Sequence, residues 1–129
     1  MSVLGLGLDL VDLERFAGVL ARHGDALLRR VVRPGEAREG VAGVAQVAHL
    51  AGLFAAKEAA MKALGTGWGG GVGFQQIEVR RDERGAPRLR FHGAAERRAA
   101  SLGVALAHLS ITHDGKVAAA VVVLEGRPA

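Results

Sequence analysis

Hydrophobic and small residues alternate strictly near the start of the chain. Residues 3–10 read Val-Leu-Gly-Leu-Gly-Leu-Asp-Leu, so that every second residue is leucine. This period of two predicts a β-strand with the leucines on one face, which we expect to be the core face. The opposite face carries Gly5, Gly7 and then Asp9. Because glycine has no side chain, another segment can pack closely on this second face, and Asp9 can cap the helix that follows.

A long helical pattern occupies the middle of the chain. Apolar residues recur at helical spacing from about Val44 to Leu64, and Gly65 provides a left-handed stop. Glu58 falls on the apolar stripe of this helix, where a carboxylate is costly unless it is paired or binds a cation. Lys62, four residues later, could supply the pair. Both explanations of Glu58 stay open at this point.

The other segments predict shorter elements. A short helix is expected after residue 12, with Leu13, Phe16 and Leu20 on its buried side. Further along the chain the patterns predict a hairpin of 74–80 and 87–91, a basic helix over 94–102, and a hairpin of 104–112 and 117–125 around a type I′ turn at Asp114-Gly115. The glycine-rich loop 65–73 lacks the Lys-Ser/Thr ending of a P-loop. We therefore predict an α+β fold, with a mostly antiparallel sheet packed around one long helix.

Length and composition restrict the class of protein. The chain has 129 residues, 50% hydrophobic and 23% charged, so we expect a single globular domain over residues 1–129. It has no cysteine, which excludes disulfides, thiolate metal sites and a cysteine nucleophile. No apolar run reaches the roughly 20 residues of a membrane helix, and the N-terminus does not resemble a signal peptide. These features predict a soluble, cytoplasmic protein without a membrane partner.

Positive charge is concentrated in one stretch. Lysine and arginine number 17 against 13 acidic residues, and six of the arginines lie between residues 15 and 38. That stretch is either a solvated helix and loop or a docking patch for an acidic protein. Two of the three lysines, Lys57 and Lys62, lie close to Glu58 in the sequence. This placement is either chance or a feature of a phosphate site, where a compact ammonium group is favoured. The few aromatic residues are not interleaved with basic ones, so nucleic acid is the weaker candidate partner.

Three motifs together identify a family. Residues 5–11 read Gly-Leu-Gly-Leu-Asp-Leu-Val, residues 54–67 read Phe-Ala-Ala-Lys-Glu-Ala-Ala-Met-Lys-Ala-Leu-Gly-Thr-Gly, and residues 110–120 read Ser-Ile-Thr-His-Asp-Gly-Lys-Val-Ala-Ala-Ala. In this order they closely resemble the holo-acyl-carrier-protein synthases, the small bacterial class of 4′-phosphopantetheinyl transferases. The resemblance spans nearly the whole chain, and the central motif is the most specific of the three.

The resemblance implies a reaction, an assembly and a set of site residues. The reaction is Mg²⁺-dependent transfer of the 4′-phosphopantetheine of coenzyme A to a serine of apo acyl carrier protein, which releases adenosine 3′,5′-bisphosphate and supports fatty acid biosynthesis. The assembly is a homotrimer with active sites between subunits. The implied residues are Asp9 and Glu58 as metal ligands, Lys62 with them in catalysis, Lys57, Lys62, Gly65, Thr66, Pro87 and His113 at the coenzyme, and Arg15, Arg22 and Arg29 at the acidic carrier.

The chemistry of these residue types agrees with the implied reaction. Mg²⁺ takes hard oxygen ligands and keeps several waters, so two carboxylates and pyrophosphate oxygens suit it. Displacement at phosphorus needs positioning and charge neutralisation more than covalent help from the protein. The attacking hydroxyl belongs to the carrier, and its proton could pass to a metal-bound water or to Glu58.

Some positions depart from the family pattern, and two other functions compete. Leu53 stands where relatives often carry arginine, Ala60-Met61 replaces the commoner Phe-Ser, and Asp25-Ala26 occupies a place where relatives often show a basic and an aromatic residue. One alternative is a small basic RNA-binding domain, which leaves Asp9 and Glu58 unexplained. The other is a structural oligomerisation module in which Glu58 merely pairs with Lys62.

Overall fold

The order of elements confirms the α+β class. The computed structural model describes residues 2–38, 40–67 and 69–127, so residue 68 of the predicted loop 65–73 and the two ends of the predicted domain over 1–129 lie outside it. The elements are β1 (Val3–Asp12), α1 (Leu13–Val31), α2 (Gly43–Leu64), the 3₁₀ turn η1 (Phe74–Gln76), β2 (Ile77–Arg81), β3 (Pro87–Phe91), α3 (Gly93–Leu102), β4 (Val104–His113) and β5 (Val117–Gly126).

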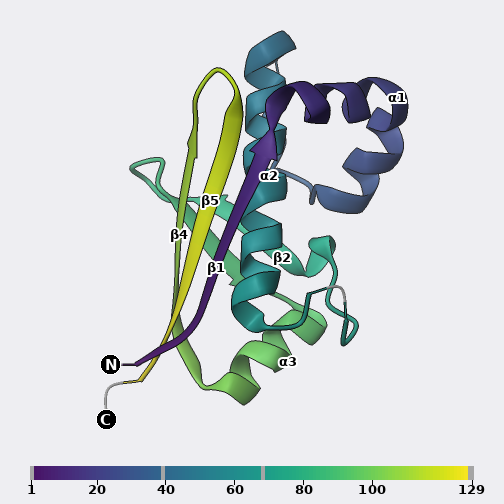
Figure 1. Cartoon of the computed structure of the whole chain (residues 1–129). Coiled ribbons are helices and arrows are strands. Elements are labelled where there is room, and N and C mark those ends of the chain that lie inside the picture. The colour runs from purple at the N-terminus through teal and green to yellow at the C-terminus, as the bar shows by residue number, and fades with distance from the viewer. Residues whose placement is uncertain (1, 39, 68, 128–129) are drawn as a thin grey trace.

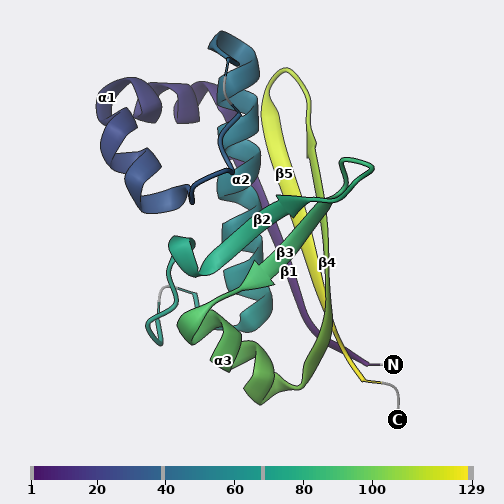
Figure 2. The same cartoon turned by 180° about the vertical axis from the view of Figure 1, so that it is seen from behind.

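Helix α2 lies at the centre of the molecule, with a sheet along one side and α1 on another (Figure 1). The sheet has the strand order β1-β5-β4 and is antiparallel throughout, while β2 and β3 form a separate hairpin that crosses α2 (Figure 2). The helix is buried on most sides, and it ends at Gly65, which has a φ of 73°. The predicted long helix and its glycine stop are confirmed.

Strand β1 faces the opposite way from the sequence prediction. Leu6, Leu8 and Leu10 point away from α2 and are 65%, 64% and 67% exposed. The glycines face the helix, since a Cβ on Gly5 would lie 2.1 Å from the carbonyl oxygen of Ala63, and one on Gly7 1.7 Å from that of Ala59. The prediction of a leucine core face is therefore wrong within this chain. The strand backbone lies directly on the helix backbone, which only residues without a Cβ allow.

Gly7→Ala is expected to lower the free energy of unfolding by about 1–3 kcal/mol or more, because the added methyl must push α2 away from β1. Urea unfolding followed by circular dichroism measures this. Gly24→Ala is the matched control, because an added Cβ meets nothing within 4 Å there. It should stay within about 1 kcal/mol of the wild type. Equal stabilities of the Gly7→Ala variant and the wild type would contradict the close approach.

The sheet face turned away from α2 is apolar. On this outer sheet face, made of Leu6, Leu8, Leu10, Val121 and Val123, the leucines of β1 are exposed and the valines of β5 half-buried. Leu8 is paired with Val121, and Leu6 with Val123, so the apolar side chains continue from strand to strand. A surface of this kind on a small domain indicates contact with another protein surface.

Three local predictions need correction. Helix α1 is not short, because it covers 19 residues with a kink at His23. The segment expected as a strand from residue 74 begins with η1, and the strand itself starts at Ile77. The β4–β5 turn is not type I′, which would need a positive φ at Asp114, and no described residue other than glycine has one. Instead the Asp114 carboxylate accepts from the N–H groups of Lys116 at 2.7 Å and Val117 at 3.1 Å.

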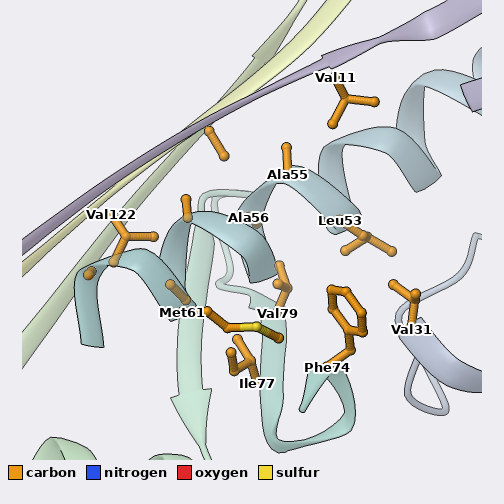
Figure 3. Packing of buried hydrophobic residues seen from close by; sticks show 14 of the residues in the cluster. Val11, Val31, Leu53, Ala55, Ala56, Met61, Phe74, Ile77, Val79 and Val122 are labelled. Carbon is orange, nitrogen blue, oxygen red and sulfur yellow. The ribbon is translucent and has the colours of Figure 1, made fainter. Parts of the chain in front are cut away.

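The core connects all of these elements through α2. Val122 of β5 packs on one side of the helix, and Ile77 of β2 and Phe74 of η1 on another (Figure 3). The Phe54 ring centroid lies 5.7 Å from that of Phe16 and 5.4 Å from that of Phe74, which joins α1, α2 and η1. Among the described residues no helix is long and apolar enough to span a bilayer.

Candidate functional site

Asp9 lies where the glycine face of β1 ends. It follows Gly7 by two residues, so its side chain is on the same side of the strand, toward α2. The carboxylate is 16% exposed, and its Oδ1 lies 3.1 Å from the Lys62 ammonium. That ammonium also donates to the carbonyl of Leu8 at 2.9 Å. Because Gly5 and Gly7 let β1 lie close to α2, Asp9 of the first motif contacts Lys62 of the central motif.

Glu58 lies one helical turn before Lys62 and is half-buried. Burial raises the pKa of its carboxyl, the negative charge of Asp9 raises it further, and the charge of Lys62 lowers it. Lys62 forms its ion pair with Asp9, whereas Glu58 forms none within residues 2–38, 40–67 and 69–127. The explanation of Glu58 as the ion-pair partner of Lys62 is therefore wrong for this structure.

The two carboxylates fit a divalent cation. Asp9 raises the pKa of Glu58, which means that their negative charges repel each other and are not fully neutralised by Lys62. A Mg²⁺ ion is typically held by one or two carboxylates together with water and substrate phosphates. No group of three or more potential metal-ligating side chains occurs in the described part of the chain. The donor set thus suits a cation that takes its remaining ligands from water and substrate.

A cavity of about 270 Å³ opens beside Asp9, between β1, α1 and α2. Apolar side chains of α1 and Phe54 of α2 form much of its wall, and Arg15 lies at the same wall. Arg22 and Arg29 are exposed further along α1, and the kink at His23 separates them. Of the three predicted docking arginines, Arg15 is the one that shares a cavity with Asp9.

Gly65 and Thr66 follow Lys62 at the end of α2. Their backbone N–H groups complete the helix end, since Gly65 donates to the Lys62 carbonyl at 3.1 Å and Thr66 to the Met61 carbonyl at 3.3 Å. The Thr66 hydroxyl makes a long contact of 3.4 Å with the carbonyl of Gly67. The two amides are therefore occupied, and the Lys62 ammonium and the Thr66 hydroxyl are the groups here that can reach a phosphate.

Lys57 lies in the core, not at the site. Its side chain is fully buried, and the ammonium donates to Glu36 Oε1 at 2.7 Å and to the carbonyls of Val31 at 2.5 Å and Phe74 at 3.3 Å. These contacts use all three of its donors. Burial lowers the pKa of Lys57, and the Glu36 carboxylate opposes this shift. The predicted coenzyme contact of Lys57 is therefore wrong, because the ammonium has neither exposure nor a free donor.

His113 and Pro87 lie on the other flank of α2. His113 ends β4 and lines a cavity together with His49 of α2. His49 precedes Glu58 by nine residues, which is about two and a half helical turns, so the two side chains point to opposite flanks. Pro87 is paired with Arg81, which lines the cavity of His113. Within one chain the structure does not bring His113 and Pro87 together with Glu58.

Glu36 is a residue that no sequence pattern singled out, and it lies within the basic stretch of residues 15–38. It is 7% exposed, and three segments converge on it. Oε1 accepts from Lys57 and from the Arg33 N–H at 2.7 Å, and Oε2 accepts from the Val79 N–H at 2.8 Å. The available signal was indirect: Lys57 on a buried helix needs a partner, and few acids lie nearby in the sequence.

Comparisons with known proteins agree over the length of the chain. Residues 5–122 match the family model of the 4′-phosphopantetheinyl transferase superfamily. The chain is 47% identical over 126 residues to holo-[acyl-carrier-protein] synthase of Edwardsiella ictaluri, covering 98% of this chain and 100% of that protein. It is 48% identical over 124 residues to the synthase of Solidesulfovibrio magneticus, with 96% and 99% covered.

A solved structure shares the arrangement of helices and strands. The holo-(acyl-carrier-protein) synthase of Bacillus anthracis, in complex with CoA (3′,5′-ADP), matches with a TM-score of 0.80 and 37% sequence identity. The match covers 97% of this chain and 98% of that one. The similarity therefore includes β1 and α2, which carry Asp9, Glu58 and Lys62, and β4, which ends at His113.

Proposed function

This chain belongs to the holo-[acyl-carrier-protein] synthases of the 4′-phosphopantetheinyl transferase superfamily, and on that premise we propose that Asp9, Glu58 and Lys62 are its catalytic centre. The reaction transfers the 4′-phosphopantetheine of coenzyme A to a serine of apo acyl carrier protein. The observation that carries the proposal is the Asp9–Lys62 ion pair one helical turn from Glu58, beside an open cavity. Neither RNA binding nor a purely structural role accounts for this cluster.

The transfer is a displacement at phosphorus. The serine oxygen forms a bond to the phosphorus that carries pantetheine, and the bond from this phosphorus to the bridging pyrophosphate oxygen breaks. The leaving group, adenosine 3′,5′-bisphosphate, takes the electron pair and the new negative charge. Such a reaction depends on positioning and on charge neutralisation. Lys62 supplies a cation for that charge, since its side chain is 51% exposed and Asp9 holds it in place.

The serine proton must leave as the new bond forms. Burial and the negative charge of Asp9 raise the pKa of the Glu58 carboxyl. A raised pKa makes a carboxylate a better proton acceptor near neutral pH. We therefore assign the role of proton acceptor to Glu58.

Asp9 and Glu58 would hold the Mg²⁺ ion that this family uses. When bound, the ion neutralises pyrophosphate charge and fixes the orientation of the phosphates. The fit depends on the two hard oxygen donors described above and on their mutual repulsion, which a cation removes.

The split of the site between two flanks of α2 supports assembly from several copies. One copy would supply Asp9, Glu58 and Lys62, and a neighbour would supply His113. The outer sheet face offers an apolar surface for such contacts, with three leucines of β1 more than 60% exposed. The homotrimer of the family, with active sites between subunits, is the proposed assembly.

The proposed acceptor is an acyl carrier protein of fatty acid biosynthesis, which is acidic. The triple variant Arg15→Ala, Arg22→Ala, Arg29→Ala is expected to lower kcat/KM for the carrier about tenfold or more at low salt, because rim charges mainly set the association rate. The maximal rate and the KM for coenzyme A should change little. Steady-state kinetics at several salt concentrations measure this. A difference that stays constant from low to high salt would contradict electrostatic docking.

One experiment tests the function directly. The purified protein is incubated with an apo carrier, coenzyme A and Mg²⁺, and mass spectrometry follows the carrier. The expected result is a gain of one phosphopantetheine group, which disappears when a chelator removes the metal. No transfer to any of several carriers under these conditions would overturn the proposal.

A further inference from the structure

A hydrogen-bonded pair of titratable side chains lies on the same side of the sheet as the outer sheet face. The Nε2 atom of His108 in β4 lies 2.5 Å from Oε1 of Glu125 in β5. Glu125 follows Val121 and Val123 at even steps along β5, so its side chain is on the outer side of the strand. His108 is paired with Val123. The pair therefore continues the outer sheet face toward the end of the sheet where the two chain termini lie (Figure 1).

Exposed apolar side chains surround this pair. In the register of the sheet, Glu125 lies between Val3 of β1 and Leu106 of β4. The neighbouring row of paired residues, which contains His108, also contains Leu6. Val3, Leu6 and Leu106 are each more than half exposed. A surface that covered these apolar side chains would also cover the pair. Burying either polar group alone would be costly, whereas together they already satisfy one hydrogen bond.

Each member of the pair keeps a polar atom that another molecule can bind. Among the residues that the structure describes, Oε2 of Glu125 and Nδ1 of His108 have no hydrogen-bond partner. The His108 side chain is 49% exposed and that of Glu125 is 19% exposed. In contact with water such a pair contributes little, but it becomes stronger when a second surface excludes the water. The pair can therefore recognise a surface by direction, which leucine and valine side chains cannot do.

A second copy of this chain is the occupant that the site requires. Glu58 and His113 lie on different flanks of α2, so one chain does not bring them together. Strand β4 carries both His108 and His113, five residues apart, which is about 17 Å along a strand. A slip of two residues along the strand direction would move His113 by about 7 Å, beyond the reach of a hydrogen bond. The position of His113 at a neighbouring site thus depends on the register of the contact.

We propose that the His108–Glu125 pair sets the register in which copies of this chain pack through the outer sheet face. Resting on the proposed function, this register places His113 of one copy at the cluster of Asp9, Glu58 and Lys62 of the next. Apolar contacts are not directional, so leucines and valines alone would allow several registers. A polar group within an apolar contact restricts the register and the number of copies, at some loss of affinity.

The experiment replaces the pair by apolar side chains, one at a time and together. The variants are His108→Leu, Glu125→Leu and their combination. The combination of Glu83→Leu and Arg84→Leu is the matched control, because it removes one acid and one base from the exposed β2–β3 turn. Native mass spectrometry and sedimentation velocity give the number of copies, and the transfer assay gives the rate per chain. Thermal melts check that each variant is folded.

The single variants are expected to weaken association. His108→Leu leaves the Glu125 carboxylate without its partner beneath the neighbouring copy, so the trimer should dissociate at a concentration about a hundredfold or more higher. The combined variant should associate at least as tightly as the wild type, but as a mixture of sizes. Its transfer rate per chain should be about tenfold or more below that of the wild type, because misplaced groups lose catalysis steeply.

Several results would overturn the proposal. One is a combined variant that forms a uniform trimer with the wild-type transfer rate. Another is a wild type that stays a single copy at high concentration. A control that also forms a mixture of sizes would attribute the mixture to added apolar surface and would overturn the proposal too. Failure of the proposed function would appear separately, as a wild-type trimer that modifies no carrier, and the numbers of copies would still test the register.

Discussion

Replacing Glu58 by glutamine is expected to lower kcat/KM for phosphopantetheine transfer roughly 10³-fold while the protein stays folded. Glutamine has nearly the same shape, but it is neutral, so the site loses one of two metal-binding carboxylates and its proposed proton acceptor. Asp9→Asn should have a similar effect, because the two carboxylates act together. The rate of carrier modification, followed by mass spectrometry, measures both.

The stability of the Glu58→Gln variant separates a functional from a structural role. Burial and Asp9 raise the pKa of the Glu58 carboxyl in the folded chain. A raised pKa means that the folded state favours the protonated form of Glu58. The stabilisation from this preference is therefore present below the usual pKa of 4.5 and is lost as the pH rises through the raised pKa. Near neutral pH, Glu58→Gln should therefore unfold at the same urea concentration as the wild type or at a higher one.

An exposed acid provides the control for activity. Glu96→Gln, in the first turn of α3 and outside the proposed catalytic centre, should keep the wild-type rate. A Glu58→Gln enzyme with more than about a tenth of the wild-type rate would contradict the proposed centre. A Glu96→Gln enzyme that loses activity would show that the assay responds to general loss of acidic charge.

Lys57→Met is expected to have the largest effect on stability, a loss of about 3–5 kcal/mol in the free energy of unfolding. The Glu36 carboxylate would stay buried without its cation, and the carbonyls of Val31 and Phe74 would lose a donor. Urea unfolding measures the loss. If the single variant does not fold, Lys57→Met combined with Glu36→Gln should recover part of the stability, because the uncompensated charge is then absent.

Lys62→Met is the matched control on the same helix. Lys62 is half-exposed and its ion pair with Asp9 is accessible to water, so its loss should change the free energy of unfolding by less than about 1 kcal/mol. Its effect should be on transfer, where Lys62 neutralises the leaving group. The two lysines are thus expected to divide into one that affects stability and one that affects activity. Similar losses of stability in both variants would contradict this division.

Much of the fold could be predicted because its signals are local. The helical spacing from Val44 to Leu64 and the stop at Gly65 predicted α2 to within a residue of its observed start at Gly43. The hairpin predicted over 104–112 and 117–125 agrees equally well with β4 and β5. The predicted turn type was wrong at the β4–β5 connection. There the Asp114 carboxylate accepts hydrogen bonds from the backbone and so sets the conformation of the turn.

The sequence by itself determined the candidate residues Asp9, Glu58 and Lys62, because motif spacing and a carboxylate on an apolar stripe are properties of the chain alone. Only the tertiary structure decided which face of β1 meets α2, and that Lys57 is buried against Glu36 while Lys62 reaches Asp9. Five residues apart, the two lysines point in different directions from one helix, and each takes its partner from a distant segment. Such long-range partners depend on how the helices and strands pack together. The pattern of hydrophobic and polar residues within one segment does not contain that information.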